Sequence, residues 1–110
     1  MNKSEKQILN CIGAGKVGVS LCNHLAEHVQ IVCIINTSKK SADQARKLIA
    51  DNNIKTLGFN SMKEASAANF WMISSSDDNI NQVANKLQAC KILRKNDIII
   101  PTSKFIFEKK

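Results

Sequence analysis

The chain has 110 residues, 44% of them hydrophobic, and carries 16 Lys and Arg against 9 Asp and Glu, for a formal net charge of +7. This length predicts a single domain over residues 1–110, and no apolar run approaches the roughly 20 residues that a membrane-spanning helix needs. The charged start Met1–Lys6 leads directly into a strand pattern, so we expect no secretory leader and a cytoplasmic location. The positive charge is scattered, without an arginine-rich helix or aromatic platform, which argues against a nucleic-acid-binding protein.

A glycine-rich segment, Gly13–Gly18, follows a strand predicted over Gln7–Ile12 and opens a helix predicted over Lys16–Glu27, which has an apolar face. Glycines with this spacing form the phosphate loop of dinucleotide-binding βαβ units: the first permits a tight turn, the second lets the pyrophosphate approach the backbone, and the third allows close helix–strand packing. The helix amino end would add N–H groups and a positive dipole end. The alternative is a turn that binds nothing. The predicted phosphate-binding residues are Gly13, Ala14, Gly15, Lys16, Val17 and Gly18.

Strand and helix signals then alternate to the end of the chain. Gln30–Ile35 is almost continuously apolar, as expected for a strand buried on both faces of a parallel sheet. Ser41–Gln44 and Ser61–Glu64 each have the form of a capping box and predict two helix starts. The first of these helices would direct Ala45, Leu48 and Ile49 toward the core. The remaining predictions are strands over Ile54–Leu57, Phe70–Ile73 and Asp97–Ile100, and a helix capped by Asp77 or Asp78 with apolar positions Ile80, Val83, Ala84, Leu87 and Cys90.

This alternation predicts an α/β fold, a Rossmann-like doubly wound parallel sheet of five strands in the order 3-2-1-4-5. A ligand crevice is expected at the carboxyl ends of the first and fourth strands. Ser74, Ser75 and Ser76 follow the fourth strand and would face the glycine loop, where ribose and nicotinamide pass close to the backbone. Their alternative role is to cap the following helix.

The residues after the second strand indicate which dinucleotide would bind. An NAD site usually has Asp or Glu there to accept hydrogen bonds from the adenosine ribose, whereas this chain has Asn36, Thr37, Ser38 and Lys39. An amide, hydroxyls and an ammonium group suit a 2′-phosphate, which a carboxylate would repel. We therefore predict NADP as the cofactor in preference to NAD; the alternative for Lys39 and Lys40 is a solvated loop.

The cysteines and histidines do not form a recognisable metal or catalytic pattern. No CxxC pair occurs, and the cysteines fall on predicted strands or apolar helix faces, so we expect reduced core residues and no metal site. His24 and His28 would lie on or near the outer face of the first helix, away from the crevice, so we predict no catalytic role for them. The cysteines are Cys11, Cys22, Cys33 and Cys90.

Three of these segments, Ile12–Gly18, Asn36–Ser38 and Ser74–Ile80, resemble the N-terminal Rossmann-like domain of the β-hydroxyacid dehydrogenase and pyrroline-5-carboxylate reductase superfamily. The likeness is to the type in which a helical domain follows, and it extends to about Ile100. Such relatives commonly carry Pro-Asp-Asp in the last segment and a His-x-Ser-Gly-like segment after the fifth strand, where this chain reads Pro101–Lys104.

The resemblance implies the NAD(P)-binding domain of an oxidoreductase. In the relatives the helical domain builds the substrate pocket and the dimer and holds the catalytic residues. This sequence has no counterpart of it, so we expect an incomplete unit that is not catalytic alone, and no catalytic residue is assigned.

Two other functions remain open from the sequence. One is a nucleotide-sensing regulatory module, although such modules often bind NAD and carry the acidic residue that Asn36 replaces. The other is a structural remnant that no longer binds nucleotide. A cluster of apolar residues near the fifth strand predicts an exposed surface and therefore a homo-oligomer or a partner chain at that edge. The cluster comprises Ile98, Ile99, Ile100, Phe105, Ile106 and Phe107.

Overall fold

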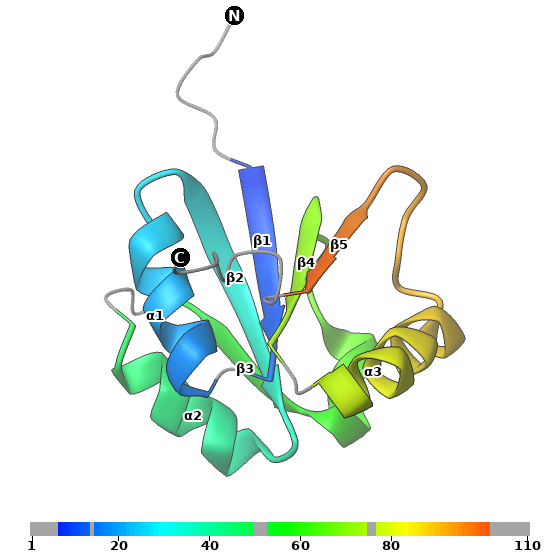
Figure 1. The fold of residues 1–110 in the computed structure, drawn as a ribbon, viewed down its shortest axis with the longest axis horizontal. Coiled ribbons are helices and arrows are strands. Elements are labelled where there is room, and N and C mark those ends of the chain that lie inside the picture. The colour runs from blue at the N-terminus through cyan, green and yellow to red at the C-terminus, as the bar shows by residue number, and fades with distance from the viewer. Residues whose placement is uncertain (1–6, 14, 50–52, 75–76, 102–110) are drawn as a thin grey trace, which may run out of the picture.

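A computed structural model describes residues 7–13, 15–49, 53–74 and 77–101. Within these residues, five parallel strands form one sheet in the order β3-β2-β1-β4-β5 (Figure 1). The predicted Rossmann-like α/β fold and its strand order are thereby confirmed. The strands are β1 (Gln7–Ile12), β2 (Val29–Asn36), β3 (Lys55–Gly58), β4 (Phe70–Ile73) and β5 (Ile98–Pro101).

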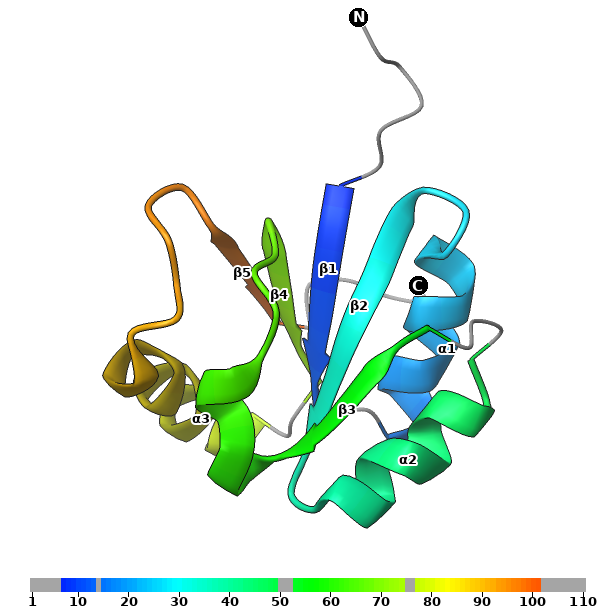
Figure 2. The same cartoon turned by 180° about the vertical axis from the view of Figure 1, so that it is seen from behind.

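Helices cover both faces of the sheet and make a three-layer structure (Figures 1 and 2). One face carries α1 (Lys16–Leu25) and α2 (Lys39–Lys47), and the other carries the 3-10 helix η1 (Phe59–Glu64) and α3 (Asp77–Cys90). None of the helices in the described residues is long and apolar enough to span a membrane.

The core has two parts because successive strand residues point to opposite faces. Cys11 and Met72 pack with Cys22 under α1 and α2, whereas Trp71 and Leu87 pack on the side of α3. Central strands buried on both faces account for the nearly continuous apolar runs in the sequence. All four cysteines lie in the described part and are free thiols, three of them buried.

Both predicted capping boxes are wrong. Helix α2 begins at Lys39, because the Oγ of Ser38 accepts a hydrogen bond from the backbone N–H of Ser41 at 3.1 Å and caps the helix earlier. Ser41 therefore lies inside the helix. Helix η1 begins directly after Gly58, and Ser61 has non-helical angles of φ −111° and ψ 20° inside it. This short turn instead buries Met62, which is 1% exposed.

Leu48, predicted to point toward the core, is 67% exposed. It follows the last residue of α2, where the helix no longer continues; Ala45 and Ile49, which were predicted with it, are buried in the core. The other differences concern boundaries. Helix α1 ends at Leu25 rather than Glu27, α3 already includes Asp77 and Asp78 rather than being capped by them, and each of β2, β3 and β5 differs by one residue at its ends.

Candidate functional site

The glycine loop leaves β1 at the carboxyl edge of the sheet, beside the end of β4. Gly13 has a φ of 81°, in the left-handed region that glycine adopts without strain. Its N–H donates to the carbonyl of Ile35 at 2.7 Å, and the N–H of Gly15 donates back to the Gly13 carbonyl at 2.8 Å. These bonds fix a tight turn directly after the strand.

Gly15 is exposed and occupies the position before the first residue of α1. Its φ of −95° and ψ of −152° are open to any residue, and an added Cβ would meet no heavy atom of the described residues within 4 Å. Within the described part of the chain, no side chain caps α1, so no capping side chain competes with a ligand for the N–H groups of its first turn. An anion can approach this helix end, where the dipole favours negative charge.

Gly18, in contrast, is buried one turn along the helix. A Cβ at this position would lie 3.0 Å from the Oγ of Ser74 and 3.5 Å from the Sγ of Cys11. A side chain at this position would push against Ser74, so glycine favours the close approach of α1 to β1 and to the end of β4. The three glycines thus meet three different requirements, a turn, an open approach and a close contact.

Ser74 lies beside the glycine loop, at the carboxyl end of β4. Its backbone N–H donates to the carbonyl of Ile12 at 2.7 Å, and its half-buried side chain faces Gly18. Lys16 is exposed at the first position of α1. Of the other predicted site residues, Val17 lies in the first turn of α1, whereas Ala14, Ser75 and Ser76 lie outside the described residues.

The loop between β2 and α2 forms hydrogen bonds with the first turn of α2. Asn36 is only 5% exposed, and its Nδ2 donates to the Oγ of Ser41 at 2.9 Å. The Oγ of Ser38 serves as the helix cap, and Thr37 is exposed. The predicted ribose-binding residues are therefore gathered at the carboxyl edge, with two of them already engaged in intramolecular hydrogen bonds.

Lys39 is also engaged, in a contact that the sequence analysis missed. Its Nζ lies 3.2 Å from Oδ2 of Asp43 and donates to the Oγ1 of Thr56 at 3.3 Å, while the Thr56 hydroxyl donates to Asp43. Hydrogen bonds from Thr56 and then Lys39 lower the pKa of the Asp43 carboxyl below its ordinary value. The i,i+4 spacing of Lys39 and Asp43 was the available signal, but the contribution of Thr56 depends on the packing of β3 against α2.

The buried thiols behind the loop are held in their protonated form. A hydrogen bond with Cys22 and burial raise the pKa of Cys11 well above its ordinary value, and burial raises the pKa of Cys33 to about 11. His24 and His28 are exposed at the far end of α1 from the loop. Among the described residues, no group of three or more His, Cys, Asp or Glu side chains is placed to hold a metal ion.

The model of a family described as the Rossmann-like domain matches residues 3–106. No curated protein matched the chain.

Among solved structures, the chain is similar to a prephenate dehydrogenase from A. aeolicus crystallised with hydroxyphenyl propionate and NAD+, at 19% identity and a TM-score of 0.70 over 92% of this chain and 35% of that one. It is similar to a putative NADP oxidoreductase from Bacteroides fragilis at 16% identity and a TM-score of 0.73, over 92% and 37%. It is also similar to RSP, a Rex-family repressor, at 13% identity and a TM-score of 0.64, over 92% and 56%. The chain therefore spans about a third to just over half the length of these proteins, and the likeness at these identities establishes the fold.

Proposed function

Because the chain belongs to the family of Rossmann-like domains, we propose that it binds a nicotinamide dinucleotide, with the pyrophosphate on the glycine loop. The observation that carries this proposal is the contrast among the three glycines. Gly13 has a positive φ, Gly15 has open space where a side chain would stand, and a side chain at Gly18 would crowd Ser74. A turn without a ligand would need the first and third features, whereas the open approach at Gly15 is what an anion requires. Similar folds include one crystallised with NAD+ and one described as an NADP oxidoreductase.

The residues proposed to contact the dinucleotide come from three segments at the carboxyl edge. The glycine loop would receive the pyrophosphate, the loop after β2 the adenosine ribose, and the serines after β4 the ribose and nicotinamide. The full set is Gly13, Ala14, Gly15, Lys16, Val17, Gly18, Asn36, Thr37, Ser38, Lys39, Ser74, Ser75 and Ser76.

NADP is proposed as the preferred cofactor. Asn36 stands at the end of β2, where an NAD-binding site usually has a carboxylate, and the exposed Thr37, Lys39 and Lys40 follow it. The hydroxyl of Ser38 accepts one hydrogen bond as a cap, and its own proton is available to a phosphate oxygen. These groups favour a 2′-phosphate through charge-assisted hydrogen bonds.

The role proposed for the domain, residues 1–110 as one unit, is to hold the cofactor of an oxidoreductase of the β-hydroxyacid dehydrogenase and pyrroline-5-carboxylate reductase type. Hydride transfer also needs a substrate in near-attack geometry and a positioned proton donor. We expect these from outside the cofactor crevice, so the purified chain should not turn over hydroxy acids, imines or aldehydes. Measurable turnover by the purified chain would contradict this role.

A partner is proposed at the β5 edge. Ile98 is 49% exposed on this edge strand, and Ile99 and Ile100 are only half-buried. Such a surface favours association with a second copy or another chain, which light scattering would detect as a mass above that of the monomer.

A cytoplasmic location is proposed as well, because the four free thiols suit a reducing compartment.

Calorimetric titration of the purified chain with NADPH, NADH and adenosine nucleotides tests the proposal. We expect binding of both dinucleotides, with NADPH the tighter. Tighter binding of NADH would contradict the proposed cofactor preference, and absence of binding by all of them would favour a structural remnant instead.

A further inference from the structure

Lys39, Asp43 and Thr56 form a closed set of polar contacts beside the proposed ribose-binding loop. The Lys39 ammonium lies 3.2 and 3.3 Å from the two carboxylate oxygens of Asp43 and 3.3 Å from the Thr56 hydroxyl oxygen. The Thr56 hydroxyl donates its own proton to Asp43. Each of these side chains is therefore satisfied by the other two, and they come from two elements, α2 and β3.

These contacts draw the Lys39 ammonium away from the carboxyl edge of the sheet. Helix α2 starts at that edge and runs back along the sheet, so Asp43 lies one turn behind Lys39, about 6 Å along the helix axis. Thr56 pairs with Ile34, two residues before Asn36 at the end of β2, which is about 7 Å back along the strand. Both partners of the ammonium thus lie behind the loop that would receive the ribose.

The main chain of Lys39 is fixed while its side chain can move. Gly58 packs against the start of α2, where a Cβ on the glycine would stand 3.1 Å from the Lys39 backbone nitrogen. The Lys39 side chain is 66% exposed and that of Asp43 38% exposed. An exposed ion pair of this kind is weak, so a phosphate dianion can compete for the ammonium.

We propose that Asp43 and Thr56 are specificity-determining residues, which restrain Lys39 so that a 2′-phosphate must displace the Asp43 carboxylate to gain the lysine contact. The inference rests on the proposed function and deepens it. It means that the chain's preference for NADP is smaller than its basic loop alone would give. Since its pKa is lowered, Asp43 is ionised at neutral pH and the restraint is present there.

The test is a double-mutant cycle read out as the ratio of the dissociation constants for NADH and NADPH. Asp43→Asn should strengthen NADPH binding about two- to five-fold, the range of an exposed ion pair, and leave NADH binding unchanged. Thr56→Val should shift the ratio in the same direction by less, and it serves as a second variant should Asp43→Asn fold poorly. In a Lys39→Met background, Asp43→Asn should produce no gain.

Glu64→Gln is the matched control, because it removes one exposed negative charge from η1, the element that follows β3. It should leave the ratio unchanged. Equal gains for NADPH and NADH in Asp43→Asn, a gain that persists in Lys39→Met, or weaker NADPH binding in Asp43→Asn would each overturn the inference while the proposed function stands. Failure of the wild-type chain to bind either dinucleotide would instead overturn the proposed function, and the inference with it.

Discussion

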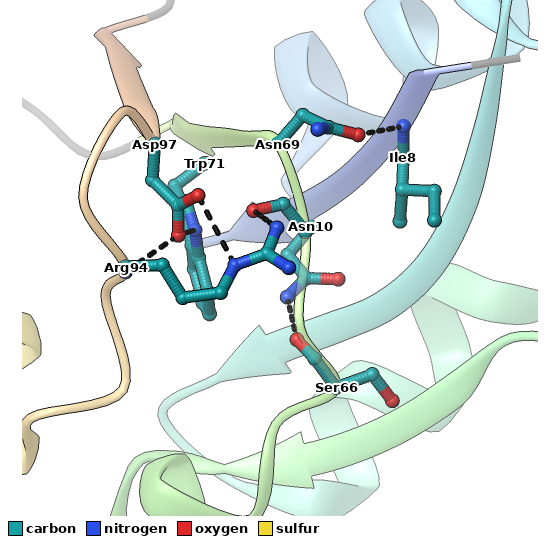
Figure 3. Close-up of polar contacts among 8 residues, drawn as sticks. Ile8, Asn10, Ser66, Asn69, Trp71, Arg94 and Asp97 are labelled. Carbon is teal, nitrogen blue, oxygen red and sulfur yellow. Dashed lines mark hydrogen bonds and ion pairs between the residues drawn. The ribbon is translucent and has the colours of Figure 1, made fainter.

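At the amino ends of β1, β4 and β5, polar side chains bond to the neighbouring strands and loops, whereas after the carboxyl end of β1 the position of Gly15 is open, with no heavy atom of the described residues within 4 Å of an added Cβ. The amino edge is closed by Asn69, whose side-chain oxygen accepts from the N–H of Ile8 and whose backbone N–H donates to the Ile8 carbonyl, both at 2.9 Å (Figure 3). Its carbonyl accepts from the N–H of Ile98 at 2.9 Å, so one residue bonds to both β1 and β5.

A buried carboxylate completes the amino edge. Asp97 has a side chain only 5% exposed, and it accepts hydrogen bonds from the indole N–H of Trp71 at 3.2 Å and from the backbone and Nε of Arg94 (Figure 3). The guanidinium of Arg94 also donates to the carbonyl of Ala68 at 2.9 Å. In the same region Asn10 donates to the carbonyl of Ser66, and its side-chain oxygen has no hydrogen-bond partner among the described residues.

The comparison separates stability from binding. Side chains that bond to one another at the amino edge hold the ends of the strands in register, while under the proposed function the small residues at the carboxyl edge would leave backbone N–H groups for the dinucleotide. Substitutions at the carboxyl edge should therefore lower the affinity for the dinucleotide and leave stability unchanged, and substitutions at the amino edge should do the reverse.

The largest expected effect is on binding, in Gly15→Val. The valine Cβ enters the space from which the pyrophosphate would approach, and loss of charge-assisted hydrogen bonds with added crowding should weaken NADPH binding by about 3 to 5 kcal/mol, more than about 100-fold. The thermal unfolding midpoint should hardly change, because the φ of −95° suits valine and the site is open. Calorimetry and circular dichroism measure the two quantities. A folded Gly15→Val protein with unchanged affinity would mean that the loop is only a turn.

The opposite pattern is expected for Asp97→Ala. It leaves the buried indole N–H of Trp71 and the Arg94 amide without their acceptor, so the free energy of unfolding should fall by roughly 2 to 4 kcal/mol. Affinity for NADPH, measured on the folded protein, should be unchanged. Urea unfolding gives the stability, and Asp97→Asn, which keeps an acceptor oxygen, should lose less. A loss of affinity equal to that in Gly15→Val would remove the distinction between the edges.

Lys39→Glu should weaken NADPH binding by about 1.5 to 3 kcal/mol, because a charge-assisted contact is lost and a second carboxylate is placed near Asp43. NADH lacks the 2′-phosphate and should lose less affinity. Parallel titrations of the wild type and the variant with both dinucleotides give the comparison. Equal affinities throughout would deny the loop after β2 a role in selectivity.

The smallest expected effect is on alkaline stability and involves Cys33, which pairs with Asn10 in the sheet. Burial raises its pKa to about 11, so the folded chain keeps the thiol protonated while the unfolded chain ionises near pH 9. Stability should therefore fall as pH rises from 9 toward 11, by roughly 1 kcal/mol at pH 10 from this group alone. Cys33→Ala should flatten the dependence of unfolding free energy on pH in this window. An unaltered slope would show that other groups cause it.

The fold could be predicted from the sequence because its strands, helices and first turn each leave a signal in consecutive residues. Continuous apolar runs identified strands buried on both faces, and the spacing of Gly13, Gly15 and Gly18 identified the turn between a strand and a helix. Leu48 could not be placed, because an apolar residue three positions after Ala45 suits the core only while the helix continues. The contact of Lys39 and Asp43 with Thr56 could not be predicted either, since it depends on the packing of β3 against α2 rather than on a spacing within the sequence.

The placement of Trp71 has a practical consequence. The chain has one tryptophan and no tyrosine, so its intrinsic fluorescence comes from a single indole that is fully buried and hydrogen-bonded to Asp97. Trp71 packs on the α3 side of the sheet, whereas the glycine loop leads into α1 on the other side, so its emission reports the folding of the sheet. A red shift then signals unfolding, whereas quenching at constant wavelength signals energy transfer to a reduced nicotinamide. A single fluorescence titration can therefore distinguish a variant that does not fold from one that does not bind the dinucleotide.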